Sequence, residues 1–233
     1  MPTDLIVDHR PRVAAERRER MRTRLLESAL IVFARKGPAA SVIQDVVAQA
    51  GVSQGTFYNY FRTQDELFDA LAQTISCEVV RAIESVIDPL EDPALKIATA
   101  IRSFLHAVRE CHIAAQFISS VGLRLINKLE FVRQVLTRDL ALGREWGFFL
   151  SVSDGPAIDL IGGTVLMAVH RIAMGGQRAD YPEAMTALVL MGLGMDADAA
   201  RGLGNWVGEA QALGDVLLHQ ALPRAVGPAP RCG

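Results

Sequence analysis

Residues 41–61 read SVIQDVVAQAGVSQGTFYNYF, and this stretch decides the fold. In its first half, apolar side chains including Val46 and Val47 recur at helical spacing, and Gly51 is a residue that readily adopts the left-handed conformation found after a helix. In its second half, Ser53 is of a type that caps a helix by accepting a hydrogen bond from a free backbone N–H group. Two short helices joined by a tight glycine turn indicate a helix-turn-helix.

The second helix of this motif has two different faces. Phe57 and Phe61 lie four residues apart, hence on one side of the helix, where they can pack onto the preceding helices. Gln54, Gly55 and Thr56, at the start of the same helix, remain free to face outward. A recognition helix placed in this way enters the major groove of DNA with its N-terminal residues at the base edges.

Helical patterns flank the motif on both sides. Before it, apolar residues recur at helical spacing from Arg17 onward until Gly37 ends the helix. After it, Thr63 and Glu66 stand three residues apart, which fits a capping box and predicts a long helix through about Ile87.

The rest of the chain continues in helical patterns without strand-type alternation of useful length, so the predicted fold class is all-α. The irregular residues 1–16 are expected to form a disordered, mildly basic arm, and residues 223–233, with proline and glycine close together, a disordered tail. Further helices are expected from residue 93 onward and at residues 113–119, 125–149, 154–174, 181–194 and 197–213.

Charge is distributed unevenly along the chain. The net charge is −2, but residues 1–63 carry ten Lys or Arg against six Asp or Glu, whereas the remaining residues carry fourteen against twenty. A basic N-terminal segment on an acidic body suggests that this segment meets a polyanion such as DNA. Charge alone leaves open the alternative of a basic segment without a partner.

Several function classes find no support in the sequence. The three widely spaced cysteines argue against a disulfide framework, and we find no His, Cys, Asp and Glu spacing typical of a metal site and no cofactor motif. No catalytic triad signal, phosphate-binding glycine loop or paired carboxylate motif is present, so we do not expect an enzyme. The longest apolar region, residues 157–174, is interrupted by Asp159, His170 and Arg171, which favours a buried helix over a membrane span and predicts a cytoplasmic protein.

The N-terminal pattern resembles that of the TetR family of bacterial transcriptional regulators. The resemblance rests on FARKG at residues 33–37, AGVSQGTFYNYF at residues 50–61 and DEL at residues 65–67. It implies a three-helix DNA-binding domain containing the helix-turn-helix at residues 17–63. It also implies a larger helical domain for effector binding and dimerisation at residues 64–222, which fits the family only in the number and length of its helices.

The resemblance also implies positions that contact double-stranded DNA. These positions are Ser41, Gln44, Ser53, Gln54, Gly55, Thr56, Tyr58, Asn59 and Gln64. Ser41 and Gln44 also fit a capping box at the start of the motif. Asn59 stands where the family commonly has His. Gln64 stands where the family often has a Lys directed at a phosphate, and the loss of this charge predicts a slightly shallower salt dependence of binding. The arginines between residues 17 and 24 either reach the flanking DNA or form a solvated helix face.

The same resemblance places a ligand pocket and a dimer interface after residue 64. Aromatic and methionine side chains line apolar cavities and adapt to varied ligands, but at helical spacing each could instead belong to the ordinary core. The two histidines could orient a ligand or play a structural part. The candidates are Phe104, His112, Phe117, Phe131, Trp146, Phe149, Met167 and His170. The dimer would form a four-helix bundle from the last two long helices of each subunit.

Together these features predict a homodimeric repressor that binds a palindromic operator and leaves it when a small, largely apolar effector moves the long helix from Asp65 to about Ile87. The alternative is a DNA-binding protein without a small-molecule effector, either architectural or regulated by a protein. A fully packed C-terminal core would favour that alternative.

Overall fold

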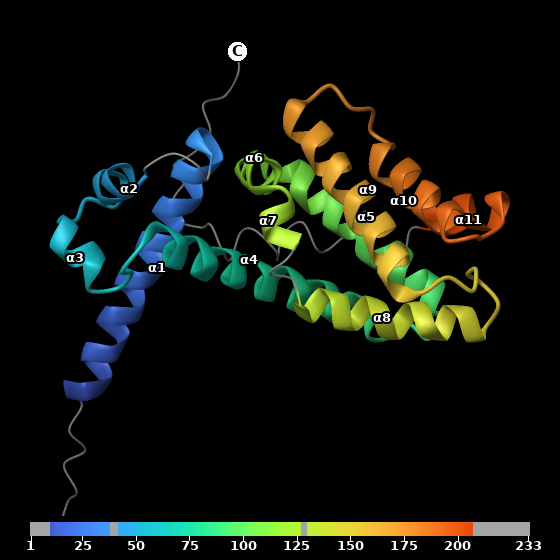
Figure 1. Cartoon of the computed structure of the whole chain (residues 1–233), viewed down its shortest axis with the longest axis horizontal. Helices are drawn as coiled ribbons and strands as arrows, with labels where there is room; N and C mark the ends of the chain where they lie inside the picture. Colours follow the sequence, from blue (N-terminus) through green and yellow to red (C-terminus); the bar gives the residue numbers. More distant parts are fainter. Residues whose placement is uncertain (1–9, 38–41, 127–129, 207–233) are drawn as a thin grey trace, which may run out of the picture.

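The computed structural model describes residues 10–37, 42–126 and 130–206, and within them the chain forms eleven α-helices and no strand. The all-α fold class is therefore confirmed. Figure 1 shows α2 and α3 at one end of the molecule and α11 at the other. The helices are α1 (Arg10–Lys36), α2 (Ile43–Ala50), α3 (Gln54–Tyr58), α4 (Gln64–Ile87), α5 (Pro93–Glu110), α6 (His112–Val121), α7 (Leu123–Ile126), α8 (Glu130–Glu145), α9 (Asp154–Met174), α10 (Tyr181–Gly192) and α11 (Ala197–Gly204).

The first helix starts earlier than the sequence pattern predicts. α1 begins at Arg10, so residues 10–16, which their composition assigned to a disordered arm, are helical. Arg12 Nε lies 3.2 Å from Glu16 Oε1, and Arg20 Nη2 lies 3.7 Å from Glu16 Oε2. Ion pairs four residues apart support an exposed helix, and hydrophobic periodicity does not reveal them.

The head of the molecule, α1 to α3, shares one apolar core. Leu25 and Phe33 of α1, Val46 of α2 and Phe57 of α3 are fully or almost fully buried. The Phe57 ring lies 6.0 Å from that of Phe61, centroid to centroid, and Phe61 is also buried. The prediction that these two rings hold the recognition helix on the preceding helices is confirmed.

The turn between α2 and α3 has the predicted glycine geometry. Gly51 adopts φ +61° and ψ +41°, and its N–H donates to the carbonyl of Ala48. Ser53 Oγ accepts from the backbone N–H of Thr56 at 3.1 Å and so caps α3. α2 starts at Ile43, and its N-cap Val42 makes no side-chain cap bond. The expected capping box of Ser41 and Gln44 stays a prediction, because Ser41 lies outside the described residues.

Local caps also fix the beginnings of α4 and α5. Thr63 Oγ1 accepts from Glu66 N at 3.0 Å, and Glu66 Oε2 accepts from Arg62 N at 2.7 Å. Asp92 Oδ1 accepts from the backbone of the first turn of α5, which has Pro93 at its first position. These caps confirm both helix starts. In the capping box, the Glu66 carboxylate accepts from the backbone N–H of Arg62 and not from that of Thr63.

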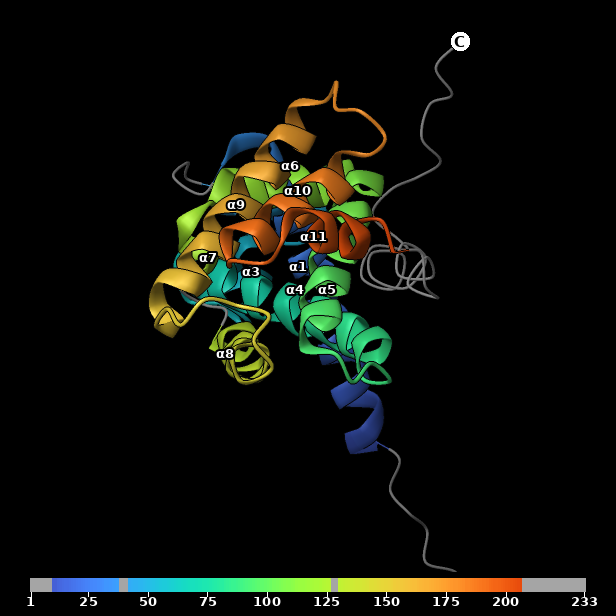
Figure 2. The ribbon, with the colours of Figure 1, turned by 90° about the vertical axis from the view of Figure 1, so that its right-hand side faces the viewer.

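The body is built around α5, which packs against α4, α8, α9, α10 and α11. Figure 2 views the body from the end that carries α10 and α11. The helix predicted at residues 125–149 is shorter, because the ring of Phe149 folds back against Gly143 and Gly147 turns the chain with φ +77°. α11 ends at Gly204, and residues 207–213 of the predicted last helix lie outside the described structure.

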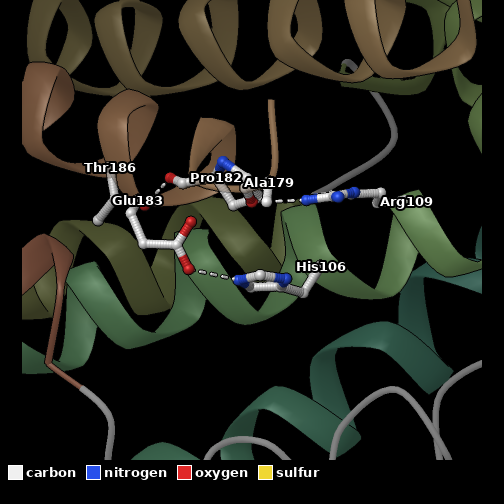
Figure 3. A network of polar contacts seen from close by, with 6 residues as sticks. All are labelled: His106, Arg109, Ala179, Pro182, Glu183 and Thr186. Atoms are coloured by element: carbon white, nitrogen blue, oxygen red, sulfur yellow. Dashed lines mark hydrogen bonds and ion pairs between the residues drawn. The ribbon is translucent and has the colours of Figure 1, made fainter. Parts of the chain in front are cut away.

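Polar contacts join the start of α10 to α5 (Figure 3). His106 Nε2 lies 2.7 Å from Glu183 Oε1, and Arg109 Nη1 donates to the carbonyl of Ala179 at 2.6 Å. Burial lowers the pKa of the Arg102 guanidinium, and the negative charge of Glu183 opposes this effect. The network holds α10 at a fixed position along α5.

Three phenylalanine rings connect the head to the body. The Phe33 ring of α1 lies 5.7 Å from that of Phe68 of α4 and 6.3 Å from that of Phe117 of α6, centroid to centroid. The Phe68 and Phe117 centroids are also 6.3 Å apart, and all three side chains are fully buried. Phe117, a predicted ligand contact, therefore belongs to the junction between the two parts.

We predict that Phe117→Ala lowers the free energy of unfolding by about 3–5 kcal/mol, because it leaves a cavity among three helices. Phe117→Leu, which keeps most of the volume, should cost less. Urea unfolding at fixed protein concentration measures both changes. Leu123→Ala is the control, since that side chain is 70% exposed and should shift stability by no more than about 0.5 kcal/mol. A loss below about 1 kcal/mol for Phe117→Ala would contradict the junction.

Candidate functional site

The predicted DNA-contacting side chains largely share the exposed surface of α2 and α3. Gln44, Gln54 and Asn59 are exposed, Tyr58 is 48% exposed, and Thr56 is half-buried. Gly55 and Ser53 are exposed as well, and they stand at the start of the short helix α3. This surface combines hydroxyl and amide groups, which are the donors and acceptors that read base edges and hold phosphates.

The hydroxyl groups at the start of α3 already bond to each other. Ser53 Oγ lies 2.9 Å from Thr56 Oγ1 and also accepts from Thr56 N. This contact uses only one of the two hydroxyl hydrogens, so the other hydroxyl can still donate to a phosphate or a base. The arrangement fixes both side chains before any ligand arrives and so reduces the entropy cost of binding.

Gln64, the first residue of α4, forms a hydrogen bond to the start of α2. Its Oε1 accepts from the backbone N–H of Val42 at 3.1 Å, which satisfies a free donor at the start of α2. The side chain is half-buried. The structure therefore gives Gln64 a positioning role for α2, which the sequence pattern did not reveal, in addition to the predicted position near a phosphate.

The body contains an apolar cavity of about 210 Å³ between α4, α5, α6, α8 and α9. Phe104 of α5 lines it and is the single aromatic side chain among its described lining residues. Most of the remaining wall is aliphatic: Ile75, Ile83 and Ile87 of α4, Ile97, Ala100 and Ile101 of α5, Ile118 of α6, Val132, Val135 and Leu136 of α8, and Ile161, Val165, Leu166 and Val169 of α9. Aliphatic residues at helical spacing look the same in sequence whether they face a cavity or a packed core, so the prediction missed them.

Three charged residues contribute to the lining of this cavity. Glu84, Lys96 and Asp139 are lining residues, and Asp139 is 2% exposed. Arg138 Nε donates to Asp139 Oδ1 at 2.9 Å, and this bond raises the pKa of Arg138. The cavity is therefore apolar over most of its surface, and its charged lining residues are two acids and one lysine.

The other predicted ligand-binding residues whose side chains the structure describes are not among the lining residues of the cavity. Phe117 is in the head–body junction, Phe149 packs against Gly143, and Trp146 and Met167 are more than half exposed. His112 bonds to Gln116, and His170 Nδ1 bonds to Ser119 Oγ at 2.8 Å. The side chain of Phe131 lies outside the described structure. Among the described residues, no group of three His, Cys, Asp or Glu side chains could hold a metal ion.

An apolar surface covers the outer side of α9 and α10. Leu160 and Met167 of α9 and Leu188 of α10 are 37%, 56% and 55% exposed. An ideal Cβ on Gly192 would lie 2.8 Å from Leu160 Cδ2, so this glycine lets α10 approach α9 closely. α9 is long and apolar enough to span a membrane by composition alone, but a partly covered helix in a helical bundle meets the same test.

Comparison with known proteins supports the assignment of the head. Residues 25–71 match the family model described as "Bacterial regulatory proteins, tetR family". The HTH-type transcriptional regulator YfiR of Bacillus subtilis is 34% identical over 74 residues, which are 32% of this chain and 36% of YfiR. The repressor Rv3405c of Mycobacterium tuberculosis is 32% identical over 68 residues, which are 29% of this chain and 36% of Rv3405c. The chain thus spans about a third of the length of these curated relatives.

Solved structures extend the similarity over the body. RolR in complex with resorcinol has a TM-score of 0.64 and 27% identity, and the match covers 84% of this chain and 100% of RolR. FadR of Bacillus subtilis in complex with stearoyl-CoA has a TM-score of 0.61 and 21% identity, over 73% of this chain and 97% of FadR. The helix-turn-helix, its family match and the shared helical body together support a bacterial transcriptional regulator of the TetR family.

Proposed function

We propose that this protein is a homodimeric repressor that binds a palindromic operator and is released by a small, largely apolar effector. The observation that carries this proposal is the course of α4. Its first turns contain the buried Leu67 and Phe68, and Phe68 contacts Phe33 of the head, whereas its later residues Ile75, Ile83 and Ile87 line the body cavity. One continuous helix thus connects a candidate effector site with the DNA-binding motif.

A second route between the cavity and the head runs through α6. Ile118 lines the cavity, and the adjacent Phe117 packs on Phe33 of α1. A ligand that favours a different position of α4 or α6 would therefore change the position of the head. Such a ligand shifts the equilibrium only by its difference in affinity for the two positions.

The volume of the cavity limits the size of the effector. A closed apolar cavity of about 150 Å³ holds benzene, and pockets for drug-sized ligands begin near about 300 Å³. A cavity of about 210 Å³ lies between these values and favours a molecule with one ring or a short branched chain. The neighbour RolR binds resorcinol, which has this size, so hydroxylated single-ring compounds are the first candidates.

The exposed apolar surface of α9 and α10 supports dimerisation. We infer that a second copy of the chain covers Leu160, Met167 and Leu188, because soluble proteins rarely leave adjacent apolar helix faces in water. A two-fold dimer would present two recognition helices on one side of DNA, so we expect its operator to be palindromic. The cavity favours this function over an effector-free DNA-binding protein, for which a fully packed core is expected.

We predict that Gly55→Trp abolishes operator binding and leaves the protein folded. An ideal Cβ at Gly55 meets no atom closer than 3.8 Å in the free protein, but the indole would occupy the space of the DNA. Electrophoretic mobility shift with a selected operator measures binding, and circular dichroism checks folding. Gly202→Trp on α11, with no atom within 4 Å of the new Cβ, is the matched control and should bind normally. Normal binding by Gly55→Trp would refute the assignment of α3.

We predict that Leu188→Arg converts the dimer into a monomer, since a charge at an apolar dimer contact must be desolvated. The side chain is 55% exposed in the single chain, so the fold should persist. Sedimentation velocity measures the mass of the particle. Leu142→Arg, on the outer side of α8, is the control with 37% exposure. A Leu188→Arg variant that remains dimeric would exclude this surface.

We predict that resorcinol or a related single-ring phenol stabilises the protein and that Ala100→Phe removes this effect by filling the cavity. A ligand at about 100 times its Kd stabilises a protein by about 2.7 kcal/mol, which thermal melting detects. Ala199→Phe, at an exposed position on α11, should respond like the original protein. If Ala100→Phe still responds fully, the ligand binds elsewhere, and if no phenol of this size binds, the proposed effector class is wrong.

A further inference from the structure

An open groove lies between the N-terminal half of α1 and the recognition helix. One wall consists of α1 side chains at helical spacing: Val13, Ala14, Arg17, Arg18 and Met21. The other wall consists of Thr56, Asn59 and Tyr60, at the end of the helix-turn-helix. The groove has a volume of about 980 Å³ and opens to solvent. It exists because α1 extends back to Arg10 and runs past α3 (Figure 1).

The arginines on the two sides of this part of α1 differ in whether they form ion pairs. Away from the groove, Arg12 and Arg20 form ion pairs with Glu16. In the groove, Arg17 and Arg18 form no ion pair with any acid among the described residues, and both are exposed. The groove wall therefore presents two positive charges that α1 itself does not neutralise.

The second wall holds one of these arginines in place. The guanidinium carbon of Arg18 lies 5.9 Å from the centroid of the Tyr60 ring, within the range of a cation–π contact. Tyr60 is half-buried and lies two residues after the end of α3. The position of this charge is therefore linked to the position of the recognition helix.

We propose that this groove holds the sugar-phosphate backbone of the DNA next to the bases read by α3, with Arg17 and Arg18 each contacting a phosphate. The inference rests on the proposed DNA-binding function and adds a contact surface to it. Two observations identify the occupant: the unpaired positive charges complement a polyanion, and Thr56 and Asn59 belong both to the groove and to the predicted DNA-contacting surface. Asn59, which stands where the family commonly has His, then contacts the backbone and not a base.

This assignment predicts how the arginines act. Phosphate contacts fix the orientation of a protein on DNA and are not specific for sequence. Each phosphate neutralised by a protein cation contributes about −0.9 to the slope of log K against log salt concentration. Two arginines per subunit give four contacts per dimer, so their loss should reduce the magnitude of this slope by about 3 to 4.

The test compares the double variant Arg17→Ala/Arg18→Ala with the original full-length protein. Fluorescence anisotropy with the selected operator, at several salt concentrations, gives the slope. We expect weaker binding, a slope reduced by about 3 to 4, and the same preferred operator sequence. Arg17→Lys/Arg18→Lys, which keeps both charges, should retain most of the slope. Circular dichroism shows whether each variant is folded.

A matched control separates local contact from the general loss of charge. Arg178→Ala/Arg201→Ala removes two exposed arginines of the body, which pair with Asp180 and Asp198. A slope changed equally by both double variants, or unchanged in Arg17→Ala/Arg18→Ala, would overturn the groove proposal. If the original protein binds no DNA while it is folded and dimeric, the DNA-binding function itself fails, and this outcome is distinct from a failure of the groove.

Discussion

The contact of Phe33, Phe68 and Phe117 is the interaction on which the arrangement of the whole molecule depends. Each ring comes from a different helix, and each of these helices also serves another part of the molecule, since α1 forms the head, α4 reaches the cavity, and α6 lies between α1 and α9. Aromatic rings at these distances gain packing energy and resist sliding. A change in the orientation of the head would therefore disturb these ring contacts unless α4 or α6 moved with it.

The recognition helix shows why this support is necessary. α3 has only five residues, far fewer than an isolated helix needs to be stable in water. Its stability comes from the Ser53 cap at one end and from the burial of Phe57 and Phe61. The exposed groups between these anchors contribute little to the fold and are therefore available for DNA.

The two sides of α9 have different surroundings. Val165 and Val169 line the cavity, whereas Leu160 and Met167 on the same helix are exposed. In the proposed dimer, a ligand in the cavity would thus lie one helix thickness from the partner subunit. This geometry allows an effector to influence the distance between the two heads as well as the orientation of each one.

The sequence by itself determined the features that depend on neighbours in the chain. Gly51, Ser53, Thr63 and Asp92 fix the ends of helices through bonds to residues two to four positions away, and such spacing is visible in a sequence. The helix-turn-helix pattern and the all-α fold class follow from the same local rules. The start of α1 was missed, because charged pairs and not apolar periodicity stabilise its first turns.

Only the tertiary structure decided what the apolar residues of the body face. Phe104 and Phe117 both lie among other apolar residues of a helix. Phe104 nevertheless lines the cavity, whereas Phe117 packs on Phe33, which is distant in sequence. The isoleucines of α4 and α5 became a cavity wall only because several helices meet there without filling the space. Hydrophobic burial has no direction of its own, so the packing partner of each side chain is set by the assembled helices and not by local sequence.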